Sequence, residues 1–369
     1  MRLSIVLSTL GLSVAMSTEL SRIRSPFEPP PKTYNYAPCA VLSNGGKRLH
    51  LWYCANRTPG DVTDYLCYRE AVRSATGWKW GGESVALEHG TPRTAWDSRH
   101  VCDPEVLAGQ FRYQGKVWRF AMLYLGCDAE HSTHNQIGVA FANSFRGPWH
   151  RYPDPILRYT DAPEAGVVGE YYAWPVYRFW GVGQPAAVSL DRLGRVLLFY
   201  SRGEGVFGEE MAELDMSDMD RGPILTQRVR VPTEGLRRND GKPLRALVNV
   251  GVALDEGRDR LYMVREELPP SDGRLPNFIA DYVQVCATSW SALRKGAGSW
   301  KILGEVDAER TGWPRNHNAT IVKDAWGRVQ AGRELTLAVS VAEAYDVLPP
   351  EFGWLWTYRV ALVSFALKR

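Results

Sequence analysis

One short pattern occurs five times along the chain, and this repetition constrains the fold more than any other feature. In each copy an apolar run is followed by a polar turn and then by a second apolar run. The second runs read RLHLWYC, VWRFAMLYLGC, RVLLFYSR, DRLYMVRE and ELTLAVSVAEA, at intervals of roughly 60–75 residues. Because long helical patterns are nearly absent, the repeated unit is predicted to be a β-hairpin.

Further apolar runs follow the hairpins, such as QIGVAFANS after the second and YVQVCATSW after the fourth. Four antiparallel strands per unit, in five units, predict an all-β chain folded as a five-bladed β-propeller. Two packed sheets would give a similar strand spacing. All five hairpins align on one another, however, and this favours the propeller.

The composition excludes two classes of partner. A formal net charge of +3 over 369 residues, without a Lys/Arg run, gives no footprint for nucleic acid. No segment approaches the ~20 continuous apolar residues that a membrane span requires. Residues 1–17 resemble a secretory signal, and the alternative is a disordered or helical cytosolic start. We therefore expect a single propeller domain over residues 18–369, monomeric, and secreted or periplasmic.

The propeller geometry predicts where a functional site lies. The innermost strand of each blade lines a central channel, and its N-terminal end opens on the same face as the loop between the second and third strands. Residues of five blades therefore converge on one pocket. We expect the innermost strands to pass through this channel near Tyr36, Cys102, Gln184, Asn249 and His317.

Two stretches resemble a known family. CDPEVLAGQFRYQGKVWRFAMLYLG followed by IGVAFANSFRGPW is similar to the second blade of the five-bladed glycosidases, namely glycoside hydrolase family 43 and the related invertases and levansucrases. RNHNATIV is similar to the last innermost strand of family 43, whose His lies near a bound cation. The resemblance implies a carbohydrate substrate, no cofactor required for the reaction, and a structural calcium or sodium ion near His317, which itself takes no part in proton transfer.

The same resemblance implies three carboxylates, one on the innermost strand of each of the first three blades: a general base, an orienting Asp and a general acid. Only the second is matched, by Asp103. Ala37 and Pro38 stand where the base is expected, and Gln184 stands where the acid is expected. Because Gln cannot donate a catalytic proton, we expect a remodelled carboxylate set.

Loop carboxylates are candidates to complete that set. Glu204 and Glu267 each lie near an arginine, Arg202 or Arg265, which would hold a carboxylate ionised and suit a base or nucleophile. The alternative is that these neighbours are surface ion pairs. We predict as catalytic Asp103, Glu204 and Glu267, and as substrate-binding Tyr36, His100, His134, Trp180, Gln184 and Arg202.

His134 belongs to the loop CDAEHSTHNQ, which is predicted to overhang the pocket. His-x-x-His with flanking acids is compatible with a metal site or a general base, and a polar loop that contacts substrate is the reading we prefer.

Asp103 is followed by Pro104, which biases it toward an extended conformation as the first residue of a strand. Strand alternation would then place Glu105 on the same side, where the two carboxylates should perturb each other's pKa. In the alternative, Asp103 only caps a turn.

The six cysteines leave several pairings open. Cross-strand bridges Cys39–Cys54 and Cys102–Cys127 are candidates, as are a Cys54–Cys67 pairing and buried free thiols.

The function predicted is a glycoside hydrolase acting on a poly- or oligosaccharide, with furanosides among the candidate substrates. The alternatives are a propeller that binds a glycan without turnover, and a polysaccharide lyase that uses His and Tyr.

Overall fold

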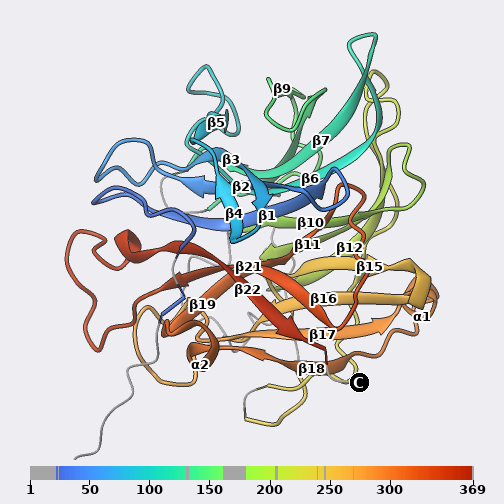
Figure 1. The fold of residues 1–369 in the computed structure, drawn as a ribbon. Coiled ribbons are helices and arrows are strands. Elements are labelled where there is room, and N and C mark those ends of the chain that lie inside the picture. The colour runs from blue at the N-terminus through green and yellow to red at the C-terminus, as the bar shows by residue number, and fades with distance from the viewer. Residues whose placement is uncertain are drawn as a thin grey trace, which may run out of the picture.

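The chain folds as five small antiparallel sheets arranged in a ring, so the prediction of a five-bladed propeller is confirmed (Figure 1). The computed structural model describes residues 22–23, 25–129, 133–160, 180–203, 207–238, 240–244, 247–268 and 270–367. The predicted signal sequence lies outside these ranges. None of the described helices is long and apolar enough to cross a membrane.

Each blade begins with the strand nearest the axis. Blade 1 contains β1 (Asn35–Ser43), β2 (Arg48–Ala55), β3 (Tyr65–Ser74), β4 (Gly77–Trp80) and β5 (Ser84–Leu87). Blade 2 contains β6 (His100–Tyr113), β7 (Lys116–Cys127), β8 (Gln136–Ala142) and β9 (His150–Arg151). Blade 3 contains β10 (Gly181–Ser189), β11 (Arg195–Gly203), β12 (Phe207–Asp215), β13 (Ile224–Leu225) and β14 (Val229–Arg230).

Blade 4 contains β15 (Gly251–Asp255), β16 (Arg260–Glu266), β17 (Val283–Ser289) and β18 (Lys301–Val306). Blade 5 contains β19 (Arg315–Ile321), β21 (Glu334–Ala342) and β22 (Arg359–Ala366), and β20 (Lys323–Asp324) crosses to pair in parallel with β1. Short helices occupy connections: α1 (Trp290–Arg294), α2 (Ala308–Thr311), and the 3-10 turns η2 (Glu256–Arg258) and η3 (Leu355–Thr357). The number of strands per sheet thus varies around the expected four.

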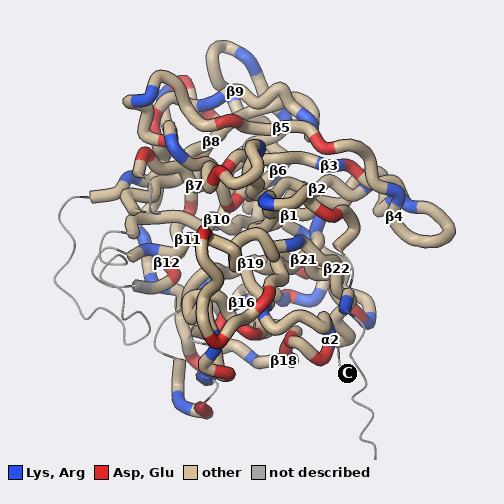
Figure 2. Tube along the Cα trace, turned by 90° about the vertical axis from the view of Figure 1, so that its left-hand side faces the viewer, with Lys and Arg blue, Asp and Glu red and all other residues tan. Residues whose placement is uncertain are grey.

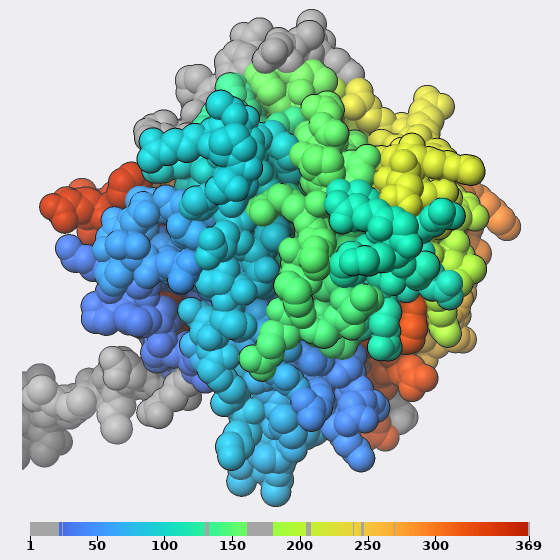
Figure 3. Space-filling model, turned by 90° about the horizontal axis from the view of Figure 1, so that it is seen from above, coloured from blue at the N-terminus to red at the C-terminus, as the bar shows by residue number. Residues whose placement is uncertain are grey.

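Figure 2 looks along the channel, with β1, β10 and β19 near the middle and β4, β9, β12 and β18 toward the rim. On the outside of blade 2, the segment before β6 lies against the segment that follows β8 (Figure 3). There Arg151 Nε donates to Asp97 Oδ2 at 2.7 Å, and Trp96 Nε1 donates to the Pro153 carbonyl at 3.1 Å.

Apolar clusters fill the space between each pair of neighbouring blades. On β11, Val196, Leu198 and Tyr200 face blade 2, while Leu197 and Phe199 face blade 4. Both faces of the inner strands are therefore buried, which explains why the repeated runs are continuously apolar rather than alternating.

One buried ion pair connects all five blades at the axis. Lys323 Nζ, in β20 of blade 5, lies 2.6 Å from Glu105 Oε1 of blade 2 and donates to the Val252 carbonyl of blade 4 at 2.9 Å. Glu105 Oε1 also accepts from Ala187 N of blade 3 at 3.1 Å, and Oε2 lies 3.7 Å from Cys39 Sγ of blade 1. The pair therefore holds the centre of the ring together.

Lys323→Met should lower the free energy of unfolding by about 3–5 kcal/mol, because it leaves the Glu105 carboxyl buried without its cation. The measurement is a denaturant titration. Arg158→Met is the control, since it breaks an exposed pair with Asp154 (side chains 61% and 62% exposed) and should cost only about 0–1 kcal/mol. Equal losses in the two variants would contradict a central role for the axial pair.

Candidate active site

Five residues, one from each blade, surround the channel in the same backbone conformation. Each has a left-handed φ between 41° and 53°. Four of them sit at a β-bulge, and the fifth, Asn249, lies shortly before its innermost strand. We call these residues the bulge ring, which consists of Ala37, Asp103, Gln184, Asn249 and Asn318. Asn and Asp tolerate this conformation better than most residues. Together with the residues that follow them, they line a channel pocket of about 350 Å³. The predicted convergence of the five innermost strands is confirmed.

A bulge takes a backbone N–H out of the strand ladder, so this donor needs another acceptor. In four blades a side chain on the second strand of the preceding blade supplies it; the donor–acceptor pairs are Ala37 N to Ser340 Oγ (2.9 Å), Asp103 N to Cys54 Sγ (3.1 Å), Asn249 N to Ser201 Oγ (2.9 Å) and Asn318 N to Glu266 Oε1 (2.6 Å). We call this second-strand site the capping position. At the equivalent place on β7, Leu125 contacts blade 3 through its side chain.

Asp103 differs from the expectation of an extended first strand residue. It is the fourth residue of β6, at a bulge between Cys102 and Glu105, with φ 46°. The bulge also separates the two carboxylates: Glu105 is engaged in the axial ion pair, whereas Asp103 opens on the channel. Glu105 therefore does not provide the electrostatic partner that we expected for Asp103.

Two other carboxylates act on Asp103 instead. Burial, which is the largest cause, and the negative charges of Asp64 and Glu266 together raise the pKa of Asp103 to about 7. A carboxyl group with such a pKa holds its proton near neutral pH and releases it readily, which are the properties of a general acid.

Asp64 lies directly before β3 and is held by three aromatic side chains. Tyr34 Oη donates to its Oδ1 at 2.6 Å, Tyr36 Oη donates to Oδ2 at 3.2 Å, and His100 Nδ1 lies 3.1 Å from Oδ2. These contacts fix the orientation of the Asp64 carboxyl group. Sequence reasoning missed Asp64, although it ends a loop that was predicted to open on the pocket.

Glu266 is buried at the capping position of blade 4. Its Oε1 accepts from Asn318 N and from Asn249 Nδ2. Oε2 lies 2.6 Å from His317 Nδ1, but without the geometry of a hydrogen bond. The predicted ion near His317 stays a prediction.

Glu267, predicted as catalytic, points elsewhere. Its Oε2 accepts from Arg265 Nη1 at 2.6 Å, and both side chains are almost fully buried. Glu267 therefore forms an ion pair, as in the alternative interpretation, but this pair is buried rather than on the surface. The sequence did contain a signal for the neighbouring Glu266. In the alignment of the five hairpins, Glu266 occupies the same position as Ser201 and Ser340, which are the capping residues of two other blades. Glu204, the other loop carboxylate, lies outside the described residues.

The predicted substrate-binding residues divide into two groups. Tyr36, His100 and Gln184 lie at or beside the channel, and Gln184 Oε1 is a buried acceptor without a donor in the described chain. Away from it, Trp180 is 7% exposed in an apolar cluster, and Arg202 Nη1 lies 3.4 Å from Glu210 Oε1.

His134 is exposed and stacks on Tyr159 with a ring separation of 4.5 Å. Glu130 and His131 of the same loop lie outside the described residues, so the arrangement proposed for His-x-x-His is not observed.

The disulfide joins Cys54 to Cys102, a pairing that the sequence analysis did not consider. Strand register explains the error, because Cys39 lies opposite Trp52 and two bulges in β6 displace Cys102 from Cys127. Cys54 lies opposite Tyr36 rather than Cys39, and Cys102 opposite Leu125 rather than Cys127, so neither predicted hairpin pair is in register. Cys39, Cys67, Cys127 and Cys286 are buried free thiols.

An aromatic cluster lies beside the channel, with Tyr34 and Tyr358 buried and with Tyr36, Phe278, Trp354 and Trp356 partly buried against them. Tyr36 contacts Tyr358 (ring centroids 5.4 Å apart), Tyr358 contacts Trp354 (6.1 Å), and Trp354 contacts Phe278 (5.4 Å). Trp356 stacks on Tyr34 nearby. We call Tyr36, Tyr358, Trp354 and Phe278 the aromatic row.

The fold is similar to that of several solved glycoside hydrolases. A family 117 glycoside hydrolase of the marine bacterium Zobellia galactanivorans aligns over 94% of this chain and 91% of its own, with 14% identity and a TM-score of 0.58. An alpha-L-arabinofuranosidase of Podospora anserina, in complex with cellotriose, covers 93% and 94%, with 11% identity and a TM-score of 0.56.

A GH43_1 enzyme of Xanthomonas citri, complexed with xylose, covers 90% of this chain and 86% of its own, with 14% identity and a TM-score of 0.52. At these identities the likeness shows the fold, and the predicted resemblance to five-bladed glycosidase propellers is confirmed at that level. Comparisons with models of protein families and with curated protein sequences gave no match.

Asp103→Asn should stabilise the protein at pH 8 by about 1–3 kcal/mol and have little effect at pH 4. The folded-state pKa of this acid is raised to about 7, so deprotonation destabilises the fold as the pH rises from the unfolded value toward 7. The range allows for the partial exposure of Asp103 to the channel.

Thermal melts at the two pH values measure this difference. Asp346→Asn, which removes a charge from a side chain that is 95% exposed, is the control. A pH-independent effect of Asp103→Asn would show that its carboxyl has an ordinary pKa.

Proposed function

We propose that the protein is a glycoside hydrolase whose proton donor is Asp103. The observation that carries this proposal is a partly open carboxyl with a pKa raised to about 7, beside the carboxylate of Asp64, in the channel of a fold that is used by glycosidases. Glycoside cleavage needs such a pair: one acid at the leaving oxygen and one carboxylate acting at the anomeric carbon.

Asp103 protonates the glycosidic oxygen as the bond to the anomeric carbon breaks. Its protonated state comes from burial and from two neighbouring negative charges, so the chain supplies an acid without the Glu that the family pattern places on blade 3.

Asp64 is the second carboxylate. Tyr34 and Tyr36 donate hydrogen bonds to it and hold it in a fixed orientation, which suits a group that assists attack at the anomeric carbon. This assignment replaces the loop carboxylates Glu204 and Glu267 in the remodelled set, and it places the second carboxylate on a blade 1 loop rather than on the blade 1 innermost strand.

The substrate is inferred to be an oligo- or polysaccharide, furanosides included. Aromatic faces stack on the C–H faces of sugar rings. At the outer end of the aromatic row, Trp354 and Phe278 are only partly buried and are the candidates for such stacking, whereas Tyr358 is buried. The orphan acceptor Gln184 Oε1 suits a sugar hydroxyl, because a buried acceptor requires a donor. A disulfide is typical of secreted proteins, which supports the predicted export.

Asp103→Asn should reduce kcat on natural glycans by about 10²–10⁴-fold, because the variant cannot donate the proton. In the wild type, kcat/KM should fall as the pH rises through about 7, where Asp103 loses its proton. Aryl glycosides with acidic leaving groups should lose much less activity, since they leave without protonation.

These rates are measured by release of reducing ends across a glycan panel, with Asp346→Asn as the control. Binding without turnover in the wild type would favour a glycan-binding module, and an unsaturated product would favour a lyase.

Trp354→Ala should raise KM for a long oligosaccharide by roughly 2–10-fold, which corresponds to about 0.5–1.5 kcal/mol of stacking, and leave kcat nearly unchanged. Trp78→Ala, on β4 far from the aromatic row, is the matched control. If both variants bind the oligosaccharide equally well, the aromatic row does not contact substrate.

A further inference from the structure

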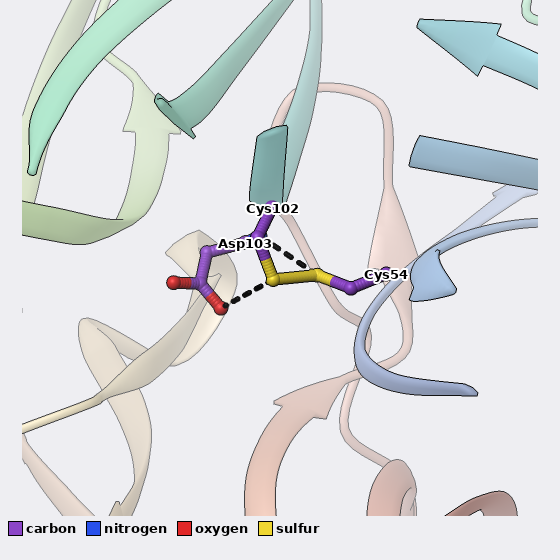
Figure 4. A group of neighbouring side chains, drawn as sticks. All are labelled: Cys54, Cys102 and Asp103. Atoms are coloured by element: carbon purple, nitrogen blue, oxygen red, sulfur yellow. Dashed lines mark hydrogen bonds between the residues drawn. A yellow bond between two sulfur atoms is a disulfide. The ribbon is translucent and has the colours of Figure 1, made fainter. Parts of the chain in front are cut away.

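The Cys54–Cys102 disulfide lies beside the carboxyl group of Asp103 (Figure 4). Cys54 Sγ accepts the Asp103 N–H at 3.1 Å, and Cys102 is the residue that precedes Asp103 in β6. Cys102 Sγ lies 3.7 Å from Asp103 Oδ1 and 3.2 Å from Tyr36 Oη. The bridge therefore touches the proposed acid on its backbone and on its side chain.

The bridge also replaces an ordinary capping contact. Ser340, Ser201 and Glu266 offer oxygen acceptors at the same position in other blades, without any covalent link. Only at blade 2, within the described chain, is the bulge fixed by a bond between neighbouring blades.

We propose that this disulfide is a positioning element for Asp103, which keeps the bulge and its carboxyl in the geometry of the proton donor, and that its reduction switches the reaction off. This inference rests on the proposed function. Two nonbonded thiols need more room than two bonded sulfur atoms, and both are buried. Reduction must therefore displace Asp103 or Tyr36.

The chemical step is a two-electron exchange with a dithiol. The S–S bond of Cys54–Cys102 breaks, two S–H groups form with protons from the dithiol, and the dithiol closes to its own disulfide. A Cys102 thiol is a hydrogen-bond donor beside Asp103 Oδ1, and a donor to a carboxylate lowers its pKa.

The other charged and titratable groups around Asp103 are Asp64 with Tyr36 and His100 on one side, Glu266 with His317 on the other, and the Glu105–Lys323 pair.

The test compares oxidised wild type, dithiothreitol-reduced wild type and Cys54→Ala/Cys102→Ala at 25 °C. Thiol titration of the denatured protein should count four thiols before reduction and six after it, since four cysteines are free and two are bridged. Both altered forms should lose at least 10-fold in kcat/KM on natural glycan at pH 7. The upper limb of the pH profile should move to lower pH in the reduced wild type, because only this form carries a Cys102 thiol beside Asp103 Oδ1. Aryl glycosides with acidic leaving groups should be affected less, which a general loss of structure would not produce.

Cys286→Ala removes a buried thiol from blade 4 and should leave the rates and the pH profile unchanged. If the double alanine variant does not fold, the reduced wild type, with its fold checked by circular dichroism and its activity recovered on reoxidation, carries the test alone. Unchanged rates and pH profiles after complete reduction overturn the proposal.

A readout without turnover separates this proposal from the proposed function. The stability difference between the wild type and Asp103→Asn, followed against pH in oxidised and in reduced protein, reports the pKa of Asp103 in each form. If no glycan is hydrolysed, the proposed function fails, and a lower Asp103 pKa on reduction still supports the positioning role. An unchanged pKa contradicts it.

Discussion

In four of the five blades, one backbone N–H of the bulge ring lies outside the strand ladder, and the rest of the central architecture depends on how this donor is satisfied. A buried, unpaired N–H is costly. The structure meets this requirement with side chains of the preceding blade, as in the bonds from Ala37 to Ser340 and from Asn249 to Ser201. Four blades are thereby attached to the preceding blade at the channel.

The same device brings the reactive groups together. Where the capping residue is Glu266, a buried carboxylate is placed at the channel; where it is Cys54, a disulfide forms beside Asp103. The axial pair of Glu105 and Lys323 closes the space below. Asp103 is consequently crowded by protein and by negative charge, and both effects raise its pKa. The chemistry proposed here follows from the way in which the ring closes.

The sequence predicted much of this because hairpins are local. Five hairpins, their turns and the alignment of Asp103 with Ala37 and Gln184 all follow from short-range patterns, and the structure confirms the five blades. What failed depends on contacts between blades. Cys54 bridges to Cys102 of the next blade, and a bulge breaks the alternation that was used to relate Asp103 to Glu105.

Two further site residues were out of reach for related reasons. Whether Glu266 or Glu267 faces the channel depends on where β16 ends. A shift of one residue along a strand turns a side chain to the opposite face of the sheet. Asp64 is brought to the channel by Tyr34, Tyr36 and His100, which hold it from two blades, and no periodicity encodes such a contact.

The central claim is that the channel gives Asp103 the properties of an acid at neutral pH. Carbon-13 NMR titration of the aspartate carboxyl groups, with the Asp103 signal identified by its absence in Asp103→Asn, measures this directly. The account predicts a midpoint near 7 for this carboxyl. A midpoint near the ordinary value of about 4 would contradict it, because Asp103 would then be ionised at neutral pH and unable to donate the proton.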